Sequence, residues 1–220
     1  MKIIIDCGHT LSGAGTGAKG VVSETDKNRE VGKRLMAMLQ EKGHTVVNAT
    51  VDYSNNDLAD RVAIANKHQD ADLFISLHLN AFNGSAYGVE TYIYNGSWSD
   101  KSRNKTIAQA IQNQLATIWS NRGVKEANFY VLRETVAPAV LVELGFCDNR
   151  EDMNKWNTEK IAKALFKGIT GADYIASTPT PSGEVKYRVV CGTYSSKANA
   201  EAQQKRLKEK GFDSFLVAIK

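Results

Sequence analysis

The chain has 220 residues, of which 42% are hydrophobic and 8% aromatic, which is enough for one full-sized domain with an ordinary core. No stretch approaches the roughly 20 consecutive apolar residues of a membrane-spanning helix, so we expect no insertion into a membrane. The net charge of +4 lies entirely in the tail, because eight Lys and Arg against four Asp and Glu follow Ser182, and the preceding residues carry 20 of each.

Strand and helix patterns then alternate along the chain. The expected strands are short, continuous apolar runs, and the expected helices place apolar residues on one face. Their alternating order predicts an α/β fold with an open, mostly parallel sheet and helices on both faces. In chain order the elements are a strand over 2–6, a helix over 26–42, a strand over 44–50, a helix over 57–67, a strand over 71–79, a helix over 101–121, a strand over 139–144, and a helix that Thr158 caps and that ends near Gly171.

The tail has a different composition. Residues 177–183 contain two of the three prolines and no apolar side chain, which is typical of an extended linker. The residues after it predict a single βαβ unit, which is too small to have much core of its own. The expected divisions are a main domain over 1–175, a linker over 176–183 and a βαβ unit over 184–220, the last with a strand at 186–191, a helix at 197–210 and a strand at 212–219.

The basic tail and the cysteines limit the partners and the compartment. A basic tail suits attachment to an anionic polymer, such as a cell wall, a membrane surface or a nucleic acid, and it equally fits a helix with a solvated basic face. Cys7, Cys147 and Cys191 are widely spaced and form no CxxC pair, so we expect no disulfide framework. Residues 2–6 predict a strand rather than a signal peptide, so we expect synthesis in the cytoplasm.

Three of the predicted strands have a polar side chain at or near their carboxyl ends. His9 follows the first strand, His78 lies near the end of the strand over 71–79, and Glu143 lies in the last apolar run. In open α/β sheets, ligands bind at the carboxyl ends of the strands, so we expect these side chains to share one rim. Glu24, in the glycine-rich loop before the first long helix, can reach the same rim.

Two imidazoles and one carboxylate form a sound zinc site with one position left for water. A further carboxylate that binds no metal can take a proton from this water and pass it to a leaving amine. The spacing alone leaves another interpretation open, because histidines at strand ends are often hydrogen-bonded core residues. Glu143 is different: an unpaired buried carboxylate is costly, so it must be paired, ligating or catalytic.

Six motifs and the glycine-rich loop that leads to Glu24 resemble, in order, the zinc-dependent N-acetylmuramoyl-L-alanine amidases of phage endolysins and bacterial autolysins. The resemblance covers about residues 1–172. The motifs are IDCGH at 5–9, ADLFISLHLNA at 71–81, GVETY at 88–92, RGVK at 122–125, FYVLR at 129–133 and PAVLVELGF at 138–146.

The resemblance implies a three-layer α/β/α fold with one Zn²⁺ per chain. It also implies that His9, Glu24 and His78 are the metal ligands and that Glu143 is the catalytic glutamate. The reaction it implies is hydrolysis of the amide between N-acetylmuramic acid and L-alanine in peptidoglycan. Cys7 stands where the family usually has proline, and because it shares a strand face with His9, a contact between Cys7 and the metal is an alternative.

The tail between Tyr187 and Asp213 resembles one repeat of the SPOR peptidoglycan-binding domain, which normally has two βαβ repeats. The resemblance implies peptidoglycan, and no nucleic acid, as the partner. Our hypothesis for the missing repeat is a homodimer in which two half-modules pair; packing of the half-module on the catalytic domain is the alternative.

Two other functions compete with the amidase. One is a zinc peptidase that cuts stem or cross-link peptides of peptidoglycan, because related folds host both reactions. The other is a catalytically silent wall-binding protein, against which the presence of all four site residues argues. For the amidase, we expect action on the cell wall after release through a holin or through lysis of a mother cell. The sequence does not distinguish an endolysin from an autolysin.

Overall fold

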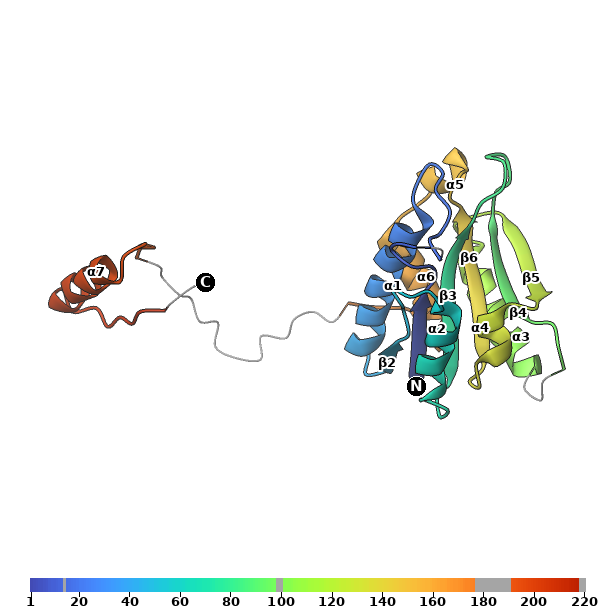
Figure 1. Cartoon of the computed structure of the whole chain (residues 1–220), viewed down its shortest axis with the longest axis horizontal. Coiled ribbons are helices and arrows are strands. Elements are labelled where there is room, and N and C mark those ends of the chain that lie inside the picture. The colour runs from blue at the N-terminus through green and yellow to red at the C-terminus, as the bar shows by residue number, and fades with distance from the viewer. Residues whose placement is uncertain (14, 98–100, 177–190, 218–220) are drawn as a thin grey trace. The chain divides into compact units, whose positions relative to one another are not determined.

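The computed structural model describes residues 1–13, 15–97, 101–176 and 191–217 (Figure 1). The chain divides into two units, Met1–Ser177 and Thr178–Lys220. Among the described residues, no helix is both long and apolar enough to cross a membrane.

A six-stranded sheet runs through the first unit, with the strand order β2-β1-β3-β6-β4-β5. From β2 to β6, neighbouring strands are parallel. Strand β4 is antiparallel to β6 and parallel to β5, so the prediction of a mostly parallel sheet is confirmed. The strands are β1 (Lys2–Cys7), β2 (Thr45–Asn48), β3 (Leu73–Asn80), β4 (Val89–Tyr94), β5 (Asn121–Ala127) and β6 (Ala139–Phe146).

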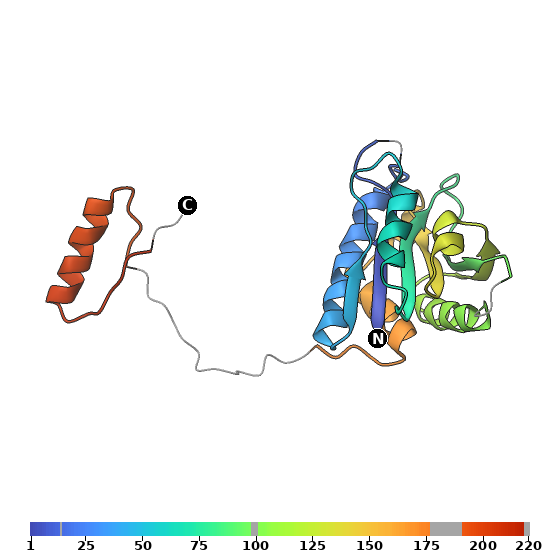
Figure 2. The same cartoon turned by 60° about the horizontal axis from the view of Figure 1, so that its bottom comes forward.

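Helices cover both faces of the sheet, which confirms the three-layer fold (Figure 2). One face packs against α1, α3 and α6, and the other packs against α2 and α4. Gly43 and Gly171 have φ values of 78° and 75° and follow the ends of α1 and α6, where a left-handed residue suits the end of a helix. The helices are α1 (Glu24–Glu41), α2 (Asp57–Asn66), α3 (Lys101–Leu115), α4 (Tyr130–Glu134), α5 (Arg150–Asn154) and α6 (Thr158–Thr170).

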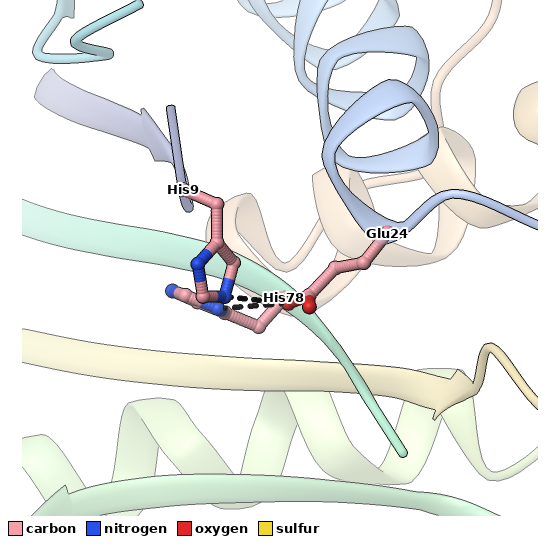
Figure 3. A group of neighbouring side chains, drawn as sticks. All are labelled: His9, Glu24 and His78. Carbon is pink, nitrogen blue, oxygen red and sulfur yellow. Dashed lines mark hydrogen bonds and ion pairs between the residues drawn. The ribbon is translucent and has the colours of Figure 1, made fainter. Parts of the chain in front are cut away.

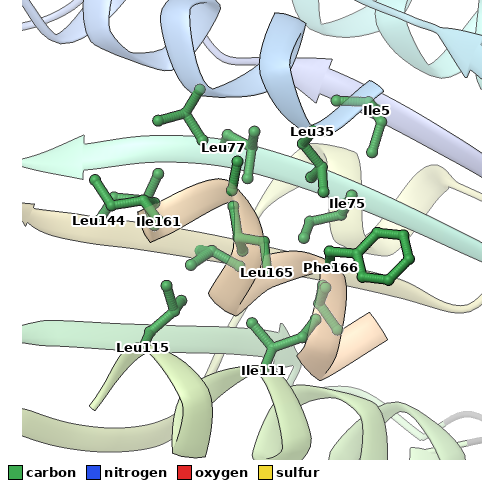
Figure 4. Packing of buried hydrophobic residues seen from close by; sticks show 14 of the residues in the cluster. Ile5, Leu35, Ile75, Leu77, Ile111, Leu115, Leu144, Ile161, Leu165 and Phe166 are labelled. Carbon is green, nitrogen blue, oxygen red and sulfur yellow. The ribbon is translucent and has the colours of Figure 1, made fainter. Parts of the chain in front are cut away.

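The larger hydrophobic core lies between the sheet and α1, α3 and α6 (Figure 4). Alternate residues of a strand point to the same face, so Ile5 of β1 and Ile75 of β3 both enter this core. They join the fully buried Leu35 of α1 and Leu165 of α6. Burying a side chain of this size contributes about 1.5–3 kcal/mol. This packing fixes the strands whose ends carry the candidate site.

The opposite face of the sheet changes from apolar to polar towards the carboxyl ends of its strands. Ile4, Phe74 and Leu141 belong to the core that α2 and α4 cover. Two residues further along a strand, a side chain returns to the same face. The polar residues that follow on this face are Asp6, Ser76, His78 and Glu143.

The region between α3 and β5 differs from the prediction. The helix expected over 101–121 ends at Leu115, and Asn121 already begins β5. Gly123, expected beyond the end of the helix, instead has a φ of 85° within β5, beside a shift in the register of its pairing with β4. Strands β4 and β5 were not predicted. Strand β5 lies at the edge of the sheet and is mostly polar, so it lacks the apolar run of a buried strand.

The start of α6 also differs by one residue. Asn157, not Thr158, is the N-cap, because its side chain accepts a hydrogen bond from the Lys160 N–H at 2.9 Å. Thr158 is the first residue of the helix, and its hydroxyl donates to Glu30.

The second unit contains α7 (Lys197–Glu209), which confirms the predicted helix. The strand expected over 212–219 is wrong for its described part, because residues 212–217 form no strand. A strand needs a hydrogen-bonded neighbour, and the described tail residues supply none. The expected linker over 176–183 and the expected strand over 186–191 lie outside the described residues, except for their terminal residues Ala176 and Cys191.

Candidate active site

Three predicted site residues meet at the carboxyl edge of the sheet (Figure 3). His9 follows β1, His78 lies near the end of β3, and Glu24 is the first residue of α1. Oε1 of Glu24 lies 3.1 Å from Nε2 of His9 and 3.1 Å from Nδ1 of His78. The candidate ligand atoms of the three residues all lie within 4.8 Å of one another.

Glu24 is buried but remains ionised. Burial alone raises the pKa of this carboxyl group, but hydrogen bonds from His78 and His9 outweigh that effect, and the pKa lies well below its ordinary value. The backbone N–H of Leu79 donates to Oε1 at 3.1 Å, and that of Ala18 donates to Oε2 at 2.9 Å. Glu24 therefore supplies a negative charge whose position is fixed by four hydrogen-bond partners.

The imidazole of His9 is oriented by the loop that follows it. Its Nδ1 lies 3.0 Å from the Gly15 carbonyl oxygen. A carbonyl only accepts hydrogen bonds, so Nδ1 donates to it, and Nε2 is the nitrogen that faces Glu24 and the site. The backbone of His9 has a φ of 66°, a conformation that costs a residue other than glycine about 1–2 kcal/mol.

The ring of His78 lies against the backbone of Gly8. A Cβ atom at position 8 would stand 2.1 Å from Cε1 and 2.3 Å from Nε2 of this ring. No side chain larger than hydrogen fits there, so the glycine of the IDCGH motif is required by the position of His78. The sequence offers no direct sign of this contact, because the two residues are far apart along the chain.

Glu143 of β6 stands beside His78 in the register of the sheet, and Glu90 of β4 stands on its other side. Its Oε2 is buried, and no described residue donates a hydrogen bond to it. Burial raises the pKa of Glu143 to about 7, with His78 lowering it and Glu24 raising it by their charges. A carboxylate with this pKa is a better base at neutral pH than an ordinary, exposed one.

Glu90 is the centre of an ion-pair cluster that the sequence did not predict. Arg122 Nε donates to its Oε2 at 2.7 Å, and Lys125 pairs with the same oxygen. The Tyr92 hydroxyl and the Asn80 amide donate to its Oε1 at 2.7 and 2.8 Å. Burial raises the pKa of Glu90, but these partners lower it to about 2. Glu90 thus places a permanent charge, balanced by cations, beside Glu143.

Cys7 lies outside the group of candidate ligands. Its Sγ packs against α1, where a Cβ atom on Gly32 would come within 2.2 Å of it. Burial raises the pKa of the thiol to about 11, so the form that binds metals is disfavoured. The expected alternation of side chains does not carry over to His9, because β1 ends at Cys7 and the chain bends at His9, whose φ is 66°.

Two imidazoles and an ionised carboxylate match the ligands that Zn²⁺ prefers, so the residues present fit a single metal ion. With Glu143 beside them, the site and the α/β/α fold define a hydrolase with a candidate metal centre.

Residues 3–172 match the family model described as N-acetylmuramoyl-L-alanine amidase, and residues 145–218 match the SPOR domain. The chain belongs to the N-acetylmuramoyl-L-alanine amidase family, whose members hydrolyse peptidoglycan.

Similar proteins extend over nearly the whole chain. The sporulation-specific N-acetylmuramoyl-L-alanine amidase of Bacillus subtilis (strain 168) is 32% identical over 222 residues, which cover 99% of this chain and 84% of that protein. The N-acetylmuramoyl-L-alanine amidase CwlM of Bacillus licheniformis is 30% identical over 219 residues, covering 99% and 85%. The solved catalytic domain of the CD27L endolysin targeting Clostridia difficile has a TM-score of 0.71 at 33% identity, and covers 79% of this chain and 98% of that one.

Proposed function

We propose that the chain is a zinc-dependent amidase in which His9, Glu24 and His78 hold one Zn²⁺. Its substrate bond is the amide between the lactyl group of N-acetylmuramic acid and the L-alanine of the stem peptide. The observation that carries the proposal is an ionised carboxylate between two imidazoles, next to the unpaired carboxylate of Glu143. When bound, Zn²⁺ lowers the pKa of a water molecule and polarises the scissile carbonyl.

Glu143 acts as the general base and then as the general acid. Its Oε2 lies in a buried position without a hydrogen-bond donor among the described residues, and its raised pKa makes it ready to accept a proton from the attacking water. The same oxygen then donates this proton to the amine nitrogen of L-alanine as the amide bond breaks. Because the neighbouring Glu90 stays ionised, its charge favours the protonated form of Glu143 between these two steps.

Product analysis distinguishes this reaction from that of a zinc peptidase. We expect digestion of purified peptidoglycan to release stem peptides that begin with a free L-alanine amine. Labelling of new amino groups, followed by mass spectrometry, checks this. New amines on glycine or diaminopimelate, without new amines on L-alanine, would instead identify a peptidase and contradict the proposal.

For the tail, we propose a wall-binding half-module over 184–220, joined by a linker over 176–183 to a catalytic domain over 1–175. The end of the amidase match at residue 172 and the separation of the chain into units after Ser177 support this division, and the SPOR match over residues 145–218 includes the tail. In the described part of the tail, α7 has no buried side chain. Tyr194, Phe212 and Val217 are also exposed, at 42%, 63% and 60%. A helix with no buried face and several exposed apolar neighbours needs a partner to form a core.

We expect a second copy of the half-module to be that partner, so the full chain should sediment as a dimer. A version ending at Ile175 should sediment as a monomer, because it keeps the catalytic core and loses the tail. Analytical ultracentrifugation at several concentrations measures both masses. If both proteins are monomers, the dimer hypothesis is wrong, and docking of the tail on its own catalytic domain becomes the better account. Release to the wall through a holin or through lysis of the mother cell stays a prediction.

A further inference from the structure

His9 has an unusual backbone conformation. Its φ is 66°, and every other positive φ among the described residues belongs to a glycine. A side chain at positive φ crowds its own backbone, so this conformation persists only where the surroundings impose it. At His9, two guanidinium groups contact the backbone.

Arg29 of α1 binds the carbonyl groups of the two peptide groups on either side of the His9 Cα. Its Nη1 donates to the Gly8 carbonyl at 3.3 Å, and its Nη2 donates to the His9 carbonyl at 2.9 Å. Because each peptide group is planar, the orientations of these two peptide groups together determine φ and ψ of His9. A single guanidinium therefore restrains the conformation of the residue between them.

Arg61 of α2 binds the same segment from the other face of the sheet. Its Nη2 donates to the His9 carbonyl at 2.6 Å, and its Nη1 donates to the Cys7 carbonyl at 2.7 Å. The carbonyls of three consecutive residues, from Cys7 to His9, thus all accept hydrogen bonds from guanidinium groups. Since α1 and α2 pack on opposite faces of the sheet, the segment after β1 is held from both sides.

Carboxylates fix both guanidinium groups. Asp52 accepts from Arg29 Nε at 3.0 Å and from its Nη2 at 2.8 Å. Arg61 pairs with Asp6, both side chains are 1% exposed, and the Ser76 hydroxyl donates to Asp6 at 2.7 Å. Burying such a charge pair is costly, and apolar residues of similar volume often serve packing equally well. The hydrogen bonds to the backbone give these two arginines a role that an apolar side chain lacks.

We propose that Arg29 and Arg61 are positioning residues that set the direction in which His9 presents its imidazole to the metal. The proposal rests on the zinc site of the proposed function. The arginines fix the backbone of His9, and the Gly15 carbonyl fixes the rotation of its ring. A ligand held in place before the metal arrives loses less freedom on binding, so both restraints raise the affinity for Zn²⁺.

The test is zinc binding by the full-length protein, measured by competition with a chromophoric chelator. Arg29→Gln is expected to weaken Zn²⁺ affinity by about 10- to 100-fold, the usual effect of losing an outer hydrogen bond at a metal site. Arg29→Lys keeps the charge without the planar fork and should restore only part of this loss. Arg34→Gln is the matched control, because Arg34 lies on the same helix and pairs with Glu159. It should bind Zn²⁺ like the wild type.

Two further measurements separate positioning from general stability. The visible absorption of the Co²⁺-substituted protein reports ligand geometry and should change in Arg29→Gln but not in Arg34→Gln. Thermal unfolding of the metal-free proteins should show similar midpoints for both variants. Arg61→Lys, which leaves a cation beside Asp6, should weaken Zn²⁺ binding in the same direction.

Unchanged Zn²⁺ affinity and an unchanged Co²⁺ spectrum in Arg29→Gln would overturn the positioning role while leaving the zinc site intact. An equal loss of affinity in Arg34→Gln would overturn it as well, because the effect would then not depend on His9. If the wild-type protein binds no Zn²⁺, the proposed function fails together with this inference.

Discussion

Replacing Glu143 with glutamine is expected to lower kcat on peptidoglycan by at least about 100-fold, the usual size of a general-base contribution. Glutamine has nearly the same shape, but its amide cannot take a proton from water or return one to the leaving amine. Zinc binding should remain, because Glu143 is not among the three candidate ligands. Turbidity loss of cell-wall suspensions, together with zinc analysis of each protein, measures both quantities.

Glu126→Gln is the matched control for this experiment. Glu126 lies on β5, is exposed and pairs with Lys101 at 2.7 Å, so its loss should leave kcat unchanged. A Glu143→Gln protein as active as the wild type would remove Glu143 from the mechanism. It would then leave the function of this unpaired carboxylate without an explanation.

Glu143→Gln should also stabilise the metal-free protein. Burial raises the pKa of Glu143 from 4.5 to about 7 in the folded state. Below about pH 4.5 the group is protonated in both the folded and unfolded states, so it carries no penalty. As the pH rises towards about 7 the penalty grows, and above that it is fully present. Chemical unfolding should therefore show that Glu143→Gln gains more stability at about pH 8 than at about pH 4.

Replacing His78 with alanine is expected to abolish both zinc binding and activity. His78 is one of three candidate ligands, and it also donates a hydrogen bond to Glu24. Loss of a direct ligand should weaken Zn²⁺ binding by more than the about 10- to 100-fold that loss of an outer hydrogen bond causes. Elemental analysis after dialysis should give about one zinc per wild-type chain and almost none for the variant.

The chain supplies its own controls, because only two of its four histidines lie in the site. His68→Ala removes an imidazole near the end of α2 and should keep both zinc and activity. Treatment of the wild type with a chelator should reproduce the loss seen in His78→Ala, and added Zn²⁺ should restore activity only to the wild type. Full activity of His78→Ala at the zinc content of the wild type would contradict the ligand assignment.

The fold could be predicted wherever a strand or helix has a recognisable apolar pattern in its own sequence. Strands β1, β3 and β6 are buried on both faces, so their sequences are continuous apolar runs. Strand β5 pairs with one neighbour only and is mostly polar, so nothing in its own sequence marks it as a strand. The helix pattern of α3 continues to Ile118, and only the sheet pairing of Asn121 shows where the next strand begins.

Part of the candidate site could also be predicted from the sequence, and part could not. The sequence pattern identified His9, His78 and Glu143 as polar residues at the ends of apolar strands, and the resemblance to a family implied their roles. The Glu90 cluster was not predictable, because Arg122 and Lys125 reach it only through the pairing of β4 with β5. The left-handed backbone of His9 was equally hidden, since it depends on arginines from two separate helices.

The position of β6 in the sheet has a consequence for synthesis of the enzyme. Strand β6 lies between β3 and β4, although it follows both of them and β5 along the chain. Without β6, no strand pairing among the described residues links β2-β1-β3 to β4-β5, and the three candidate metal ligands all lie with the first of these groups. During synthesis, the chain therefore presents the three proposed metal ligands before Glu143, the proposed proton acceptor. Because β6 both brings Glu143 and links the two groups of strands, one strand completes the sheet and the proposed site together.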